Sequence, residues 1–189
     1  QRQMCIRDRL KPAVDLLAGI PSIVYGFFGL VVIVPLVQSL FGGSGKGILT
    51  ASVLLGIMIL PTIISVTEAS IRAVPESYYE GALALGATKE RSVFCAVMPG
   101  ARSGITAGVI LGTGRAIGET MAVVMVAGNA AVMPDGLLSG VRTLTANIVL
   151  EMGYAADLHR EALIATAVVL FVFILIINLM FSLLKRKEG

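Results

Sequence analysis

Charged residues are scarce in this chain of 189 residues, and that scarcity argues against a soluble domain. Only 14% of the residues are charged, whereas soluble domains carry roughly a quarter. Hydrophobic residues make up 56%, and the mean hydropathy is +0.89. The net charge of +3 is spread over several short loops, which excludes the concentrated basic patch of a nucleic-acid-binding protein. The composition therefore points to lipid as the surrounding solvent.

Residues for metal binding or covalent catalysis are also nearly absent. The two cysteines, Cys5 and Cys95, are far apart, and His159 is the only histidine. They form no cluster with the spacing of a metal site or of a nucleophile with its base. The glycine-rich stretch 42–47 contains Lys46, but no Ser or Thr follows this lysine as it would in a P-loop. We expect no cofactor on this chain, and any ATP hydrolysis must take place on a partner.

Long apolar runs fill the chain instead. A helix needs about 20 apolar residues to cross the hydrocarbon core of a bilayer. Four segments satisfy this requirement, at residues 13–41, 47–66, 104–127 and 162–184. Pro21 and Pro35 punctuate the first segment, and Pro61 lies near the end of the second. We therefore predict an all-α membrane protein with four transmembrane helices.

Lysine and arginine counts orient these spans, because cytoplasmic loops are enriched in both residues. The successive segments outside the spans carry 4, 1, 4, 2 and 3 of them. This alternation places both termini in the cytoplasm, together with the loop 67–103. It places the segment 128–161 outside, where we expect an ordered loop with one or two short helices. The basic tail at residues 185–187 is expected to anchor the chain on the inner leaflet.

The first nine residues do not fit this pattern. The chain opens with Gln1, and residues 1–9 are polar and show no periodicity. They lack the apolar core and the small-residue cleavage site of a signal peptide. We expect this stretch to be a non-native or disordered tail, with the native sequence beginning near residue 10 and upstream segments missing.

The cytoplasmic loop has the chemistry of a helix, a turn and a second helix. Pro75 and Glu76 suit a first helical turn, and a helix is expected over residues 78–85. Gly86 suits the left-handed position that ends a helix, and Thr88 suits the N-cap of a second helix that runs to about residue 97. Two interpretations are open: a helix pair that lies on the bilayer, or a rigid knob that docks on a cytoplasmic ATPase and is fixed by hydrogen bonds of Glu80.

The same loop resembles the EAA loop of ABC importer permeases. That pattern runs Glu-Ala-Ala, three residues, Gly, nine residues, Ile-x-Leu-Pro, and four of its positions match here, at Glu80, Ala82, Gly86 and Pro99. Gly81 stands in place of an alanine, Ala96 in place of the isoleucine and Met98 in place of the leucine. The resemblance implies that the loop couples the chain to an ATPase through Glu80, Gly81, Ala82, Gly86, Ala87, Thr88 and Pro99.

The third apolar segment contains two opposite charges. Arg115 and Glu119 are four residues apart, so one continuous helix would place them on the same face. Each charge is costly near the middle of a bilayer, and a buried pair rarely repays its desolvation. The pair is either a structural lock between helices or part of an anion path. In the second case Arg115 binds an oxyanion. Glu119 then holds Arg115 in place when no anion is present, and it can also accept a hydrogen bond from a protonated anion.

Small and hydroxyl-bearing residues surround this pair. Gly112, Gly114 and Gly118 are expected to let neighbouring helices approach closely. Thr113 and Thr120 add hydroxyl groups to the expected path.

The sequence around Arg115 is similar to the PstC-type permeases of phosphate ABC importers. The similarity lies in Gly-Arg-Ala-Ile-Gly-Glu-Thr-Met-Ala-Val at 114–123, in Gly128-Asn129, and in the segment 17–26. It implies a MetI-like permease core with four of the six transmembrane helices of the family. It also implies three kinds of partner: a PstA-like permease, a PstB-like ATPase dimer that binds ATP and Mg, and an extracytoplasmic phosphate-binding protein. The location implied is a bacterial or archaeal plasma membrane.

Several other functions stay open at this point. Among ABC importer permeases, one alternative is a permease for molybdate, sulfate or another oxyanion instead of phosphate. Another is a PstA-type sister subunit. Outside it, the alternatives are an integral-membrane enzyme with its site at Arg115 and Glu119, and a subunit that signals without transporting. The lack of a nucleophile or metal cluster argues against the enzyme.

Overall fold

The computed structural model describes the backbone of residues 2–188 and the side chains of residues 11–181 and 183. Within these residues the chain is helical, and the only β feature is an isolated bridge between Gly128 and Val141. The elements are α1 (Arg2–Gly19), α2 (Ser22–Phe28), η1 (Gly29–Ile33), α3 (Val34–Phe41), α4 (Ile48–Arg72), α5 (Glu76–Ala84), α6 (Lys89–Ser92), η2 (Val93–Val97), α7 (Met98–Gly100), α8 (Arg102–Gly118), α9 (Met121–Val126), α10 (Leu144–Glu151) and α11 (Asp157–Glu188).

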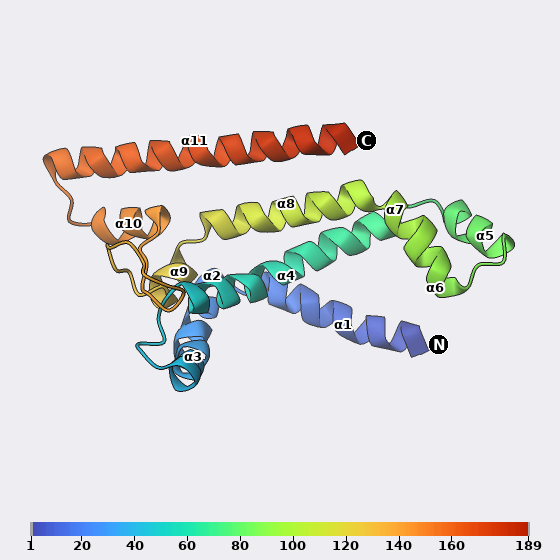
Figure 1. Ribbon diagram of the computed structural model, residues 1–189, viewed down its shortest axis with the longest axis horizontal. Coiled ribbons are helices and arrows are strands. Elements are labelled where there is room, and N and C mark those ends of the chain that lie inside the picture. The colour runs from blue at the N-terminus through green and yellow to red at the C-terminus, as the bar shows by residue number, and fades with distance from the viewer. Residues whose placement is uncertain (1, 189) are drawn as a thin grey trace.

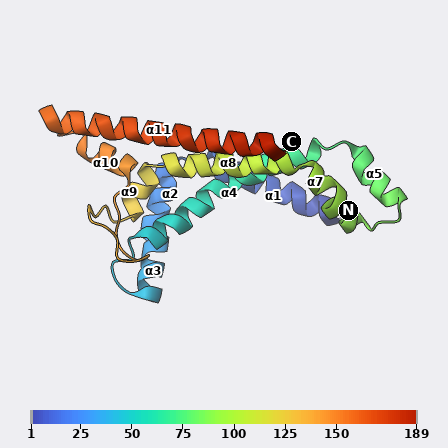
Figure 2. The same cartoon turned by 45° about the horizontal axis from the view of Figure 1, so that its top comes forward.

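The helices form an elongated layer with two distinct ends (Figures 1 and 2). The helices α4, α8 and α11 run along its length, with α8 packed between the other two. The segment α5–α7 projects from one end, where both termini of the chain also lie. The short helices α3, α9 and α10 lie at the opposite end. The loop predicted to be cytoplasmic and the segment predicted to be external are therefore at opposite ends of the layer.

A compact apolar core holds the end that contains α9. It is built from α2, η1, α3, α4 and α9. Leu54, Met58 and Val126 are its largest fully buried apolar side chains. Gly29 lets η1 approach this core, because a methyl group there would lie 2.8 Å from Leu54 and 2.9 Å from Val126. The buried side chains of this core thus hold the three helical segments of the first span, α2, η1 and α3, against α4 and α9.

The membrane-spanning helices differ in their bounds from the sequence expectation. In the part of the chain that the structure describes, three helical stretches are long and apolar enough to cross a bilayer: Ser22–Phe41, Ile48–Arg72 and Asp157–Phe181. A fourth is a bent pair, Lys89–Gly100 and Arg102–Gly118, with an angle of 68° between its halves. The third span was expected to continue to residue 127, but its helix ends at Gly118 and the chain restarts as α9.

The first expected span is also divided. Helix α1 ends at Gly19, and a separate helix begins at Ser22 after Pro21. The buried Tyr25 hydroxyl donates to the carbonyl of Leu17 at 2.7 Å and so secures the last turn of α1 against α2. The backbone of α1 includes residues 2–9, which were expected to be a tail. The side chains of that stretch, and those of the basic tail at 185–187, lie outside the described residues.

Helices α4 and α8 meet along a seam of glycines. Methyl groups built on Gly104, Gly108 and Gly112 would meet Ser70, Val66 and Ile63 of α4. At Gly112 the nearest atom, Ile63 Cγ1, would be only 2.6 Å away. The sequence expectation named Gly112 correctly but also Gly114 and Gly118, beside which nothing lies within 4 Å. The seam therefore follows residues four apart, which is the spacing that allows close helix contact along one face.

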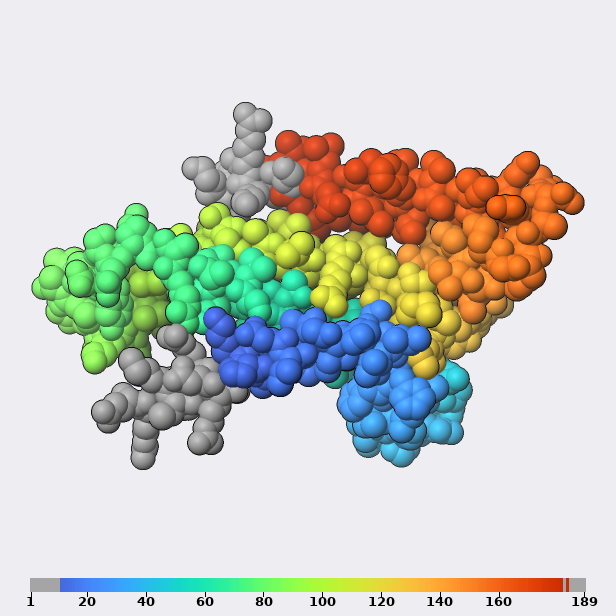
Figure 3. All heavy atoms as spheres, turned by 180° about the vertical axis from the view of Figure 1, so that it is seen from behind, coloured from blue at the N-terminus to red at the C-terminus, as the bar shows by residue number. Residues whose placement is uncertain are grey.

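Helix α11 is the least covered of the three long, straight apolar stretches. Only 6% of the most apolar stretch of this helix is buried against the rest of the described chain. Its described contacts are with α8 and α10, and Figure 3 shows it as a separate ridge along one side of the molecule. An exposed apolar helix of this length is suited to lipid or to another membrane helix, in keeping with the transmembrane prediction.

Candidate functional site

The projecting segment contains a sharp turn at Gly86. Helix α5 begins at Glu76, two residues before the expected start at 78, and ends at Ala84, one residue before the expected end at 85. Gly86 has a φ of +85°, a left-handed conformation that favours glycine. Its N–H donates to Leu83 at 2.9 Å, and the Ala87 N–H donates to Ala82 at 3.1 Å. This pair of hydrogen bonds is the Schellman motif, which satisfies carbonyls at the end of the helix.

The second half of the segment starts at Thr88, as the sequence predicts. The Thr88 side chain accepts from the Arg91 N–H at 3.3 Å and caps α6. Ser92, which is fully buried, donates to the Thr88 carbonyl at 3.0 Å. From Lys89 the helix runs through the π-helical turn η2 and α7 to Gly100, so Pro99 lies inside it instead of following it. The result is two short helices joined at a rigid corner.

Glu80 does not fix this corner. Its side chain is exposed, and it forms no hydrogen bond or ion pair with the described residues. The expectation that Glu80 holds the loop by hydrogen bonds is therefore not met within this chain; the capping by Gly86 and Thr88 holds it instead. Leu85 and Phe94 are also exposed, by 91% and 67%. The projecting segment thus offers a free carboxylate beside exposed apolar side chains.

Arg115 and Glu119 do not pair. Helix α8 ends at Gly118, and Glu119 adopts an extended conformation with φ −68° and ψ 130°, so the two residues no longer share a helix face. Arg115 donates from Nη1 to Thr62 Oγ1 of α4 at 3.3 Å. Glu119 accepts at Oε1 from the Ala122 N–H at 3.1 Å and so caps α9. Neither the structural lock nor the holding of Arg115 by Glu119 is present.

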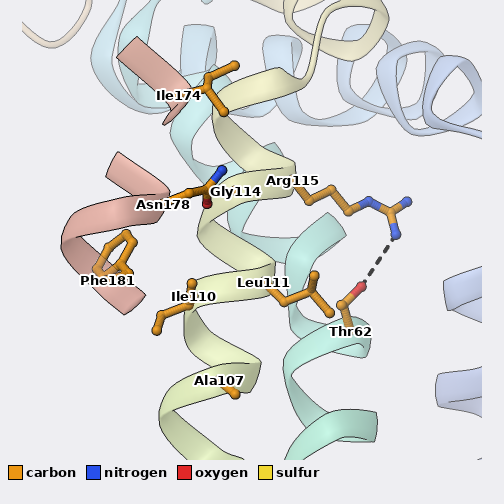
Figure 4. Close-up of a pocket in the computed structure, with 9 residues that line it drawn as sticks. All are labelled: Thr62, Ala107, Ile110, Leu111, Gly114, Arg115, Ile174, Asn178 and Phe181. Carbon is orange, nitrogen blue, oxygen red and sulfur yellow. Dashed lines mark hydrogen bonds between the residues drawn. The ribbon is translucent and has the colours of Figure 1, made fainter. Parts of the chain in front are cut away.

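Arg115 instead lines a large cavity, which we call the Arg115 groove (Figure 4). Its volume is about 680 Å³. It lies among α4, α8 and α11 and is lined by Thr62, Ala107, Ile110, Leu111, Gly114, Arg115, Ile174, Asn178 and Phe181. Figure 4 shows the Arg115 side chain directed towards Thr62, with Asn178 on the other side of α8. Among the described residues that line the groove, Arg115 is the only charged one and most of the others are apolar, so this lining presents positive charge to an occupant.

The polar neighbours of Arg115 differ from those expected. Thr113 is not part of the groove, and its hydroxyl donates to the Val109 carbonyl within α8 at 2.9 Å. Thr120 donates to the Gly118 carbonyl at 3.3 Å, at the break after α8. Thr62 was not predicted, although a hydroxyl directly after Pro61 within an apolar span is a signal that could have identified it. Asn178, the one strongly polar residue of the last span, does line the groove.

The segment after α9 is ordered by a charged network. Arg142 donates to the Asn129 carbonyl at 3.0 Å and to Glu151 Oε1 at 2.7 Å. The other oxygen of Glu151 lies 3.4 Å from His159 Nε2. A hydrogen bond from Tyr154 and the nearby Arg142 lower the pKa of Glu151, and the same hydrogen bond raises the pKa of Tyr154. The network connects the end of α9, the end of α10 and the start of α11.

Together these features define the class of protein. Within the described residues, three or four helices are long and apolar enough to span a membrane, the second half of a bent pair lines a groove that contains one charged side chain, and a helical corner projects from one end. This is a polytopic helical membrane protein. Residues 5–188 match the family described as "Binding-protein-dependent transport system inner membrane component", and the chain belongs to that family.

Curated relatives cover nearly the whole chain. It is 40% identical over 94% of its length to the "Probable ABC transporter permease protein YqgH" of Bacillus subtilis. It is 39% identical to each "Phosphate transport system permease protein PstC" of Xylella fastidiosa (strain Temecula1) and Mesorhizobium japonicum, over 97% and 93% of its length. The chain spans only 59%, 64% and 61% of the length of these three relatives.

A solved structure is similar to the whole chain. It is titled "Inward facing conformations of the MetNI methionine ABC transporter", and it matches with a TM-score of 0.76 at 20% identity. The match covers 100% of this chain and 78% of the other. At this identity the likeness concerns the fold alone, and it confirms the predicted all-α, MetI-like permease core.

Proposed function

We propose that this chain forms part of the permease of an ATP-driven importer of inorganic phosphate. The observation that carries the proposal is the Arg115 groove, where one arginine is the only charge among the described lining residues of a largely apolar cavity between helices long and apolar enough to span a membrane. The paired N–H donors of a guanidinium group match the oxygens of a tetrahedral oxyanion. A cation within a membrane is energetically costly, so its presence there suggests that it has a function. The similarity to relatives described as phosphate transport permeases supports phosphate as that oxyanion.

The projecting corner is the proposed coupling site to the ATPase. Its residues Glu80, Gly81, Ala82, Gly86, Ala87, Thr88 and Pro99 would contact a PstB-like ATPase dimer, which binds ATP and Mg. The rigid corner at Gly86 and the free carboxylate of Glu80 support this role, because a docking element needs a fixed shape and unengaged groups. ATP binding would then favour one of two arrangements of the helices.

The remaining partners and the orientation follow from the same proposal. A PstA-like permease would pair with this chain, and an extracytoplasmic phosphate-binding protein would deliver the anion. The projecting corner and both chain termini lie at one end of the layer (Figure 1), which supports their common location in the cytoplasm of a bacterial or archaeal cell. The segment 128–161 would then face outside. The positive-inside count of the loops supports the same orientation.

Two alternatives share the fold. A permease for sulfate or molybdate would have the same corner and the same groove cation. A PstA-type sister subunit is the weaker alternative, because the similarity to PstC-type relatives covers over 90% of the chain. Uptake measurements separate the first alternative from phosphate import.

The experiment measures uptake of labelled phosphate, sulfate and molybdate in a host that lacks its own phosphate importer and carries the gene containing this chain. We expect uptake of phosphate alone, and its loss on Arg115→Ala. The matched control is Arg160→Ala, which removes an exposed arginine outside the groove. Sulfate or molybdate uptake in place of phosphate would refute the proposed substrate, and full phosphate uptake by Arg115→Ala would refute the role of the groove.

A further inference from the structure

An exposed apolar loop lies between α9 and α10, at the end of the layer that also holds α3 (Figures 1 and 2). We call residues 131–138 the apolar loop, and every one of them is exposed. Val132, Met133 and Leu137 are exposed by 70%, 89% and 67%. Asp135 is the only charged residue in the loop. Apolar side chains gathered in this way indicate a surface that contacts something other than the described chain.

The base of the apolar loop is bonded to the start of α4. The Ile48 N–H donates to the Ser139 carbonyl at 3.2 Å, and the Leu49 N–H donates to the Leu137 carbonyl at 2.8 Å. Both N–H groups belong to the first turn of α4, where no carbonyl of the helix itself can accept from them. The loop therefore has a fixed position relative to this end of α4.

Further contacts close the loop against α9. The Val141 N–H donates to the Ala127 carbonyl at 2.9 Å, beside the bridge between Gly128 and Val141. The packing is also close at Gly47, where a methyl group would lie only 2.6 Å from the Leu138 carbonyl oxygen. The two ends of the segment are thus held together, and the apolar loop extends from a rigid base.

The hydrogen bonds to α4 also fix the depth of the loop in a membrane. Residues 48–67 contain no charged side chain, and Glu68 follows them. At about 1.5 Å per residue this helical stretch is about 30 Å long, which equals the thickness of the hydrocarbon core of a bilayer. If the stretch fills that core, Ile48 lies at its boundary. Leu137 and Ser139, which are bonded to the first residues of α4, lie at the same boundary.

We propose that the apolar loop is a lipid-binding surface, which places Val132, Met133 and Leu137 among the lipid headgroups at the end of α4. Lipid is the occupant because the base of the loop lies at the membrane boundary and continues the surface of an apolar span. The inference goes beyond the proposed function, since it holds whatever substrate the chain transports. By this contact the bilayer sets the position of the ends of α4 and α9, to which the loop is bonded.

Lys46 supplies a polar group beside the apolar side chains. It precedes α4 by two residues, and a methyl group on Gly128 would lie 3.6 Å from its Cβ. Lysine side chains at the ends of spans lay their apolar stems along the membrane and place the ammonium group among the headgroups. A basic group next to exposed apolar side chains is also the chemistry of segments that lie in the membrane interface.

The competing occupant is a protein that docks at this end of the layer, such as the binding protein of the proposed importer. A docking protein covers the loop only while it is bound, whereas lipid surrounds the importer at all times. The two occupants therefore differ in the environment of the loop when the importer is alone in a bilayer.

The experiment measures that environment with a nitroxide spin label on Met133→Cys. The variant is made in the intact importer containing this chain, with Cys5 and Cys95 replaced by serine and with partner subunits free of cysteine. The importer is placed in nanodiscs of phosphatidylethanolamine and phosphatidylglycerol, in which both membrane faces are open to water. Collisions of the label with oxygen, which concentrates in lipid, are compared with collisions with a water-soluble nickel chelate.

Leu158→Cys is the matched control. Leu158 is also apolar and 78% exposed, but it stands among Asp157, His159 and Arg160 at the start of α11, where we expect water. The ratio of oxygen to nickel collisions should be several-fold higher at position 133 than at position 158. If Met133→Cys fails to assemble, Val132→Cys replaces it, because Val132 is exposed in the same loop.

A charge placed in the loop tests the role of the apolar side chains. Leu137→Asp should move the loop towards water, because a carboxylate is costly to take out of water. Nickel collisions with a label on Val132→Cys should then rise several-fold. The same aspartate at position 158 is the control, and it should leave the label at position 132 unchanged.

Four outcomes would overturn the inference. The first is equal access of the nickel chelate to positions 133 and 158. The second is exclusion of both reagents from position 133, which would indicate burial against another subunit. The third is a label that lies in water in the importer alone and becomes shielded when the binding protein is added. The fourth is an unchanged nickel collision rate at position 132 in Leu137→Asp.

Discussion

Arg142 and Glu151 form an ion pair, Nη1 to Oε1 at 2.7 Å, across nine residues of the segment that follows α9. Arg142 also holds the Asn129 carbonyl, so one guanidinium joins the end of α9 to the end of α10. Both side chains are largely covered, with 25% and 19% exposed. Removing one member of a covered, hydrogen-bonded pair leaves the other without its partner, which costs more than the pair itself contributes.

Arg142→Met is therefore expected to lower the unfolding temperature of the detergent-solubilised protein. The matched control is Arg72→Met, which breaks the exposed pair between Arg72 and Glu68 one helical turn apart. Exposed pairs of this kind contribute less than about 1 kcal/mol. Thermal unfolding followed by circular dichroism should show a clearly larger loss for Arg142→Met. Equal losses in the two variants would mean that the network does not hold the segment together.

The same network predicts a pH window of stability. The pKa of Glu151 is lowered by the hydrogen bond from Tyr154 and by Arg142, so its contribution is present above its ordinary value of 4.5 and is lost as the pH falls through the depressed pKa. The pKa of Tyr154 is raised by its hydrogen bond to Glu151, so its contribution is present below 10.0 and is lost as the pH rises through the raised pKa. Tyr154→Phe should weaken both dependences in unfolding-temperature profiles recorded from acid to alkaline pH. Profiles that match those of the unchanged protein would contradict this reading.

Local chemistry made the projecting corner predictable. Gly86 and Thr88 act on backbone groups only a few residues away, so their roles as helix stop and N-cap depend on sequence alone. The apolar length of the spans is likewise a local property, which is why the all-α membrane fold could be predicted. The bounds of the first and third spans differ from the apolar runs because the chain breaks at Pro21 and after Gly118, within those runs.

Tertiary contacts explain what the sequence did not reveal. Spacing alone placed Arg115 and Glu119 on one face, but this holds only if the helix continues. Thr145, a residue of α10, binds the Glu119 carbonyl that the break leaves free, and Glu119 caps the next helix. Similarly, Thr62 is the partner of Arg115 only because α4 and α8 pack at that level. No local pattern encodes a contact between residues 53 positions apart.

The glycine seam leads to a prediction on stability. Gly112→Ala would place a methyl group 2.6 Å from Ile63 Cγ1, and overpacking of this kind costs about 1–3 kcal/mol. Gly114→Ala on the same helix meets nothing within 4 Å, so it should gain up to about 1 kcal/mol of helix propensity. Unfolding free energies in mixed micelles should therefore move in opposite directions for the two variants. A stabilising Gly112→Ala would show that α4 and α8 are not closely packed there.

The corner at Gly86 gives a second pair of glycine variants. An alanine at position 86 must adopt the left-handed conformation, at a cost of about 1–2 kcal/mol. Gly81→Ala lies in the interior of α5 with open space around it, and it should be neutral or slightly stabilising. Hydrogen exchange of the Gly86 and Ala87 amides should quicken in Gly86→Ala only. ATPase activity coupled to phosphate uptake should fall in the same variant, and unchanged coupling would argue against the docking role of the corner.

Thr62 supplies the sharpest test of the groove. Thr62→Val removes the hydroxyl that accepts from Arg115 Nη1, and the side chain keeps nearly the same size. We expect phosphate uptake to fall several-fold, since the bond is exposed and a typical hydrogen bond contributes a net of about 0.5–1.5 kcal/mol. Thr62→Ser keeps the hydroxyl and should restore most of the uptake. The matched control is Thr113→Val, whose hydroxyl already bonds Val109 within its own helix, so uptake should be unaffected. Equal effects of the Thr62 and Thr113 valine variants would show that any hydroxyl near Arg115 matters equally, and that the contact between α4 and Arg115 has no special part in transport.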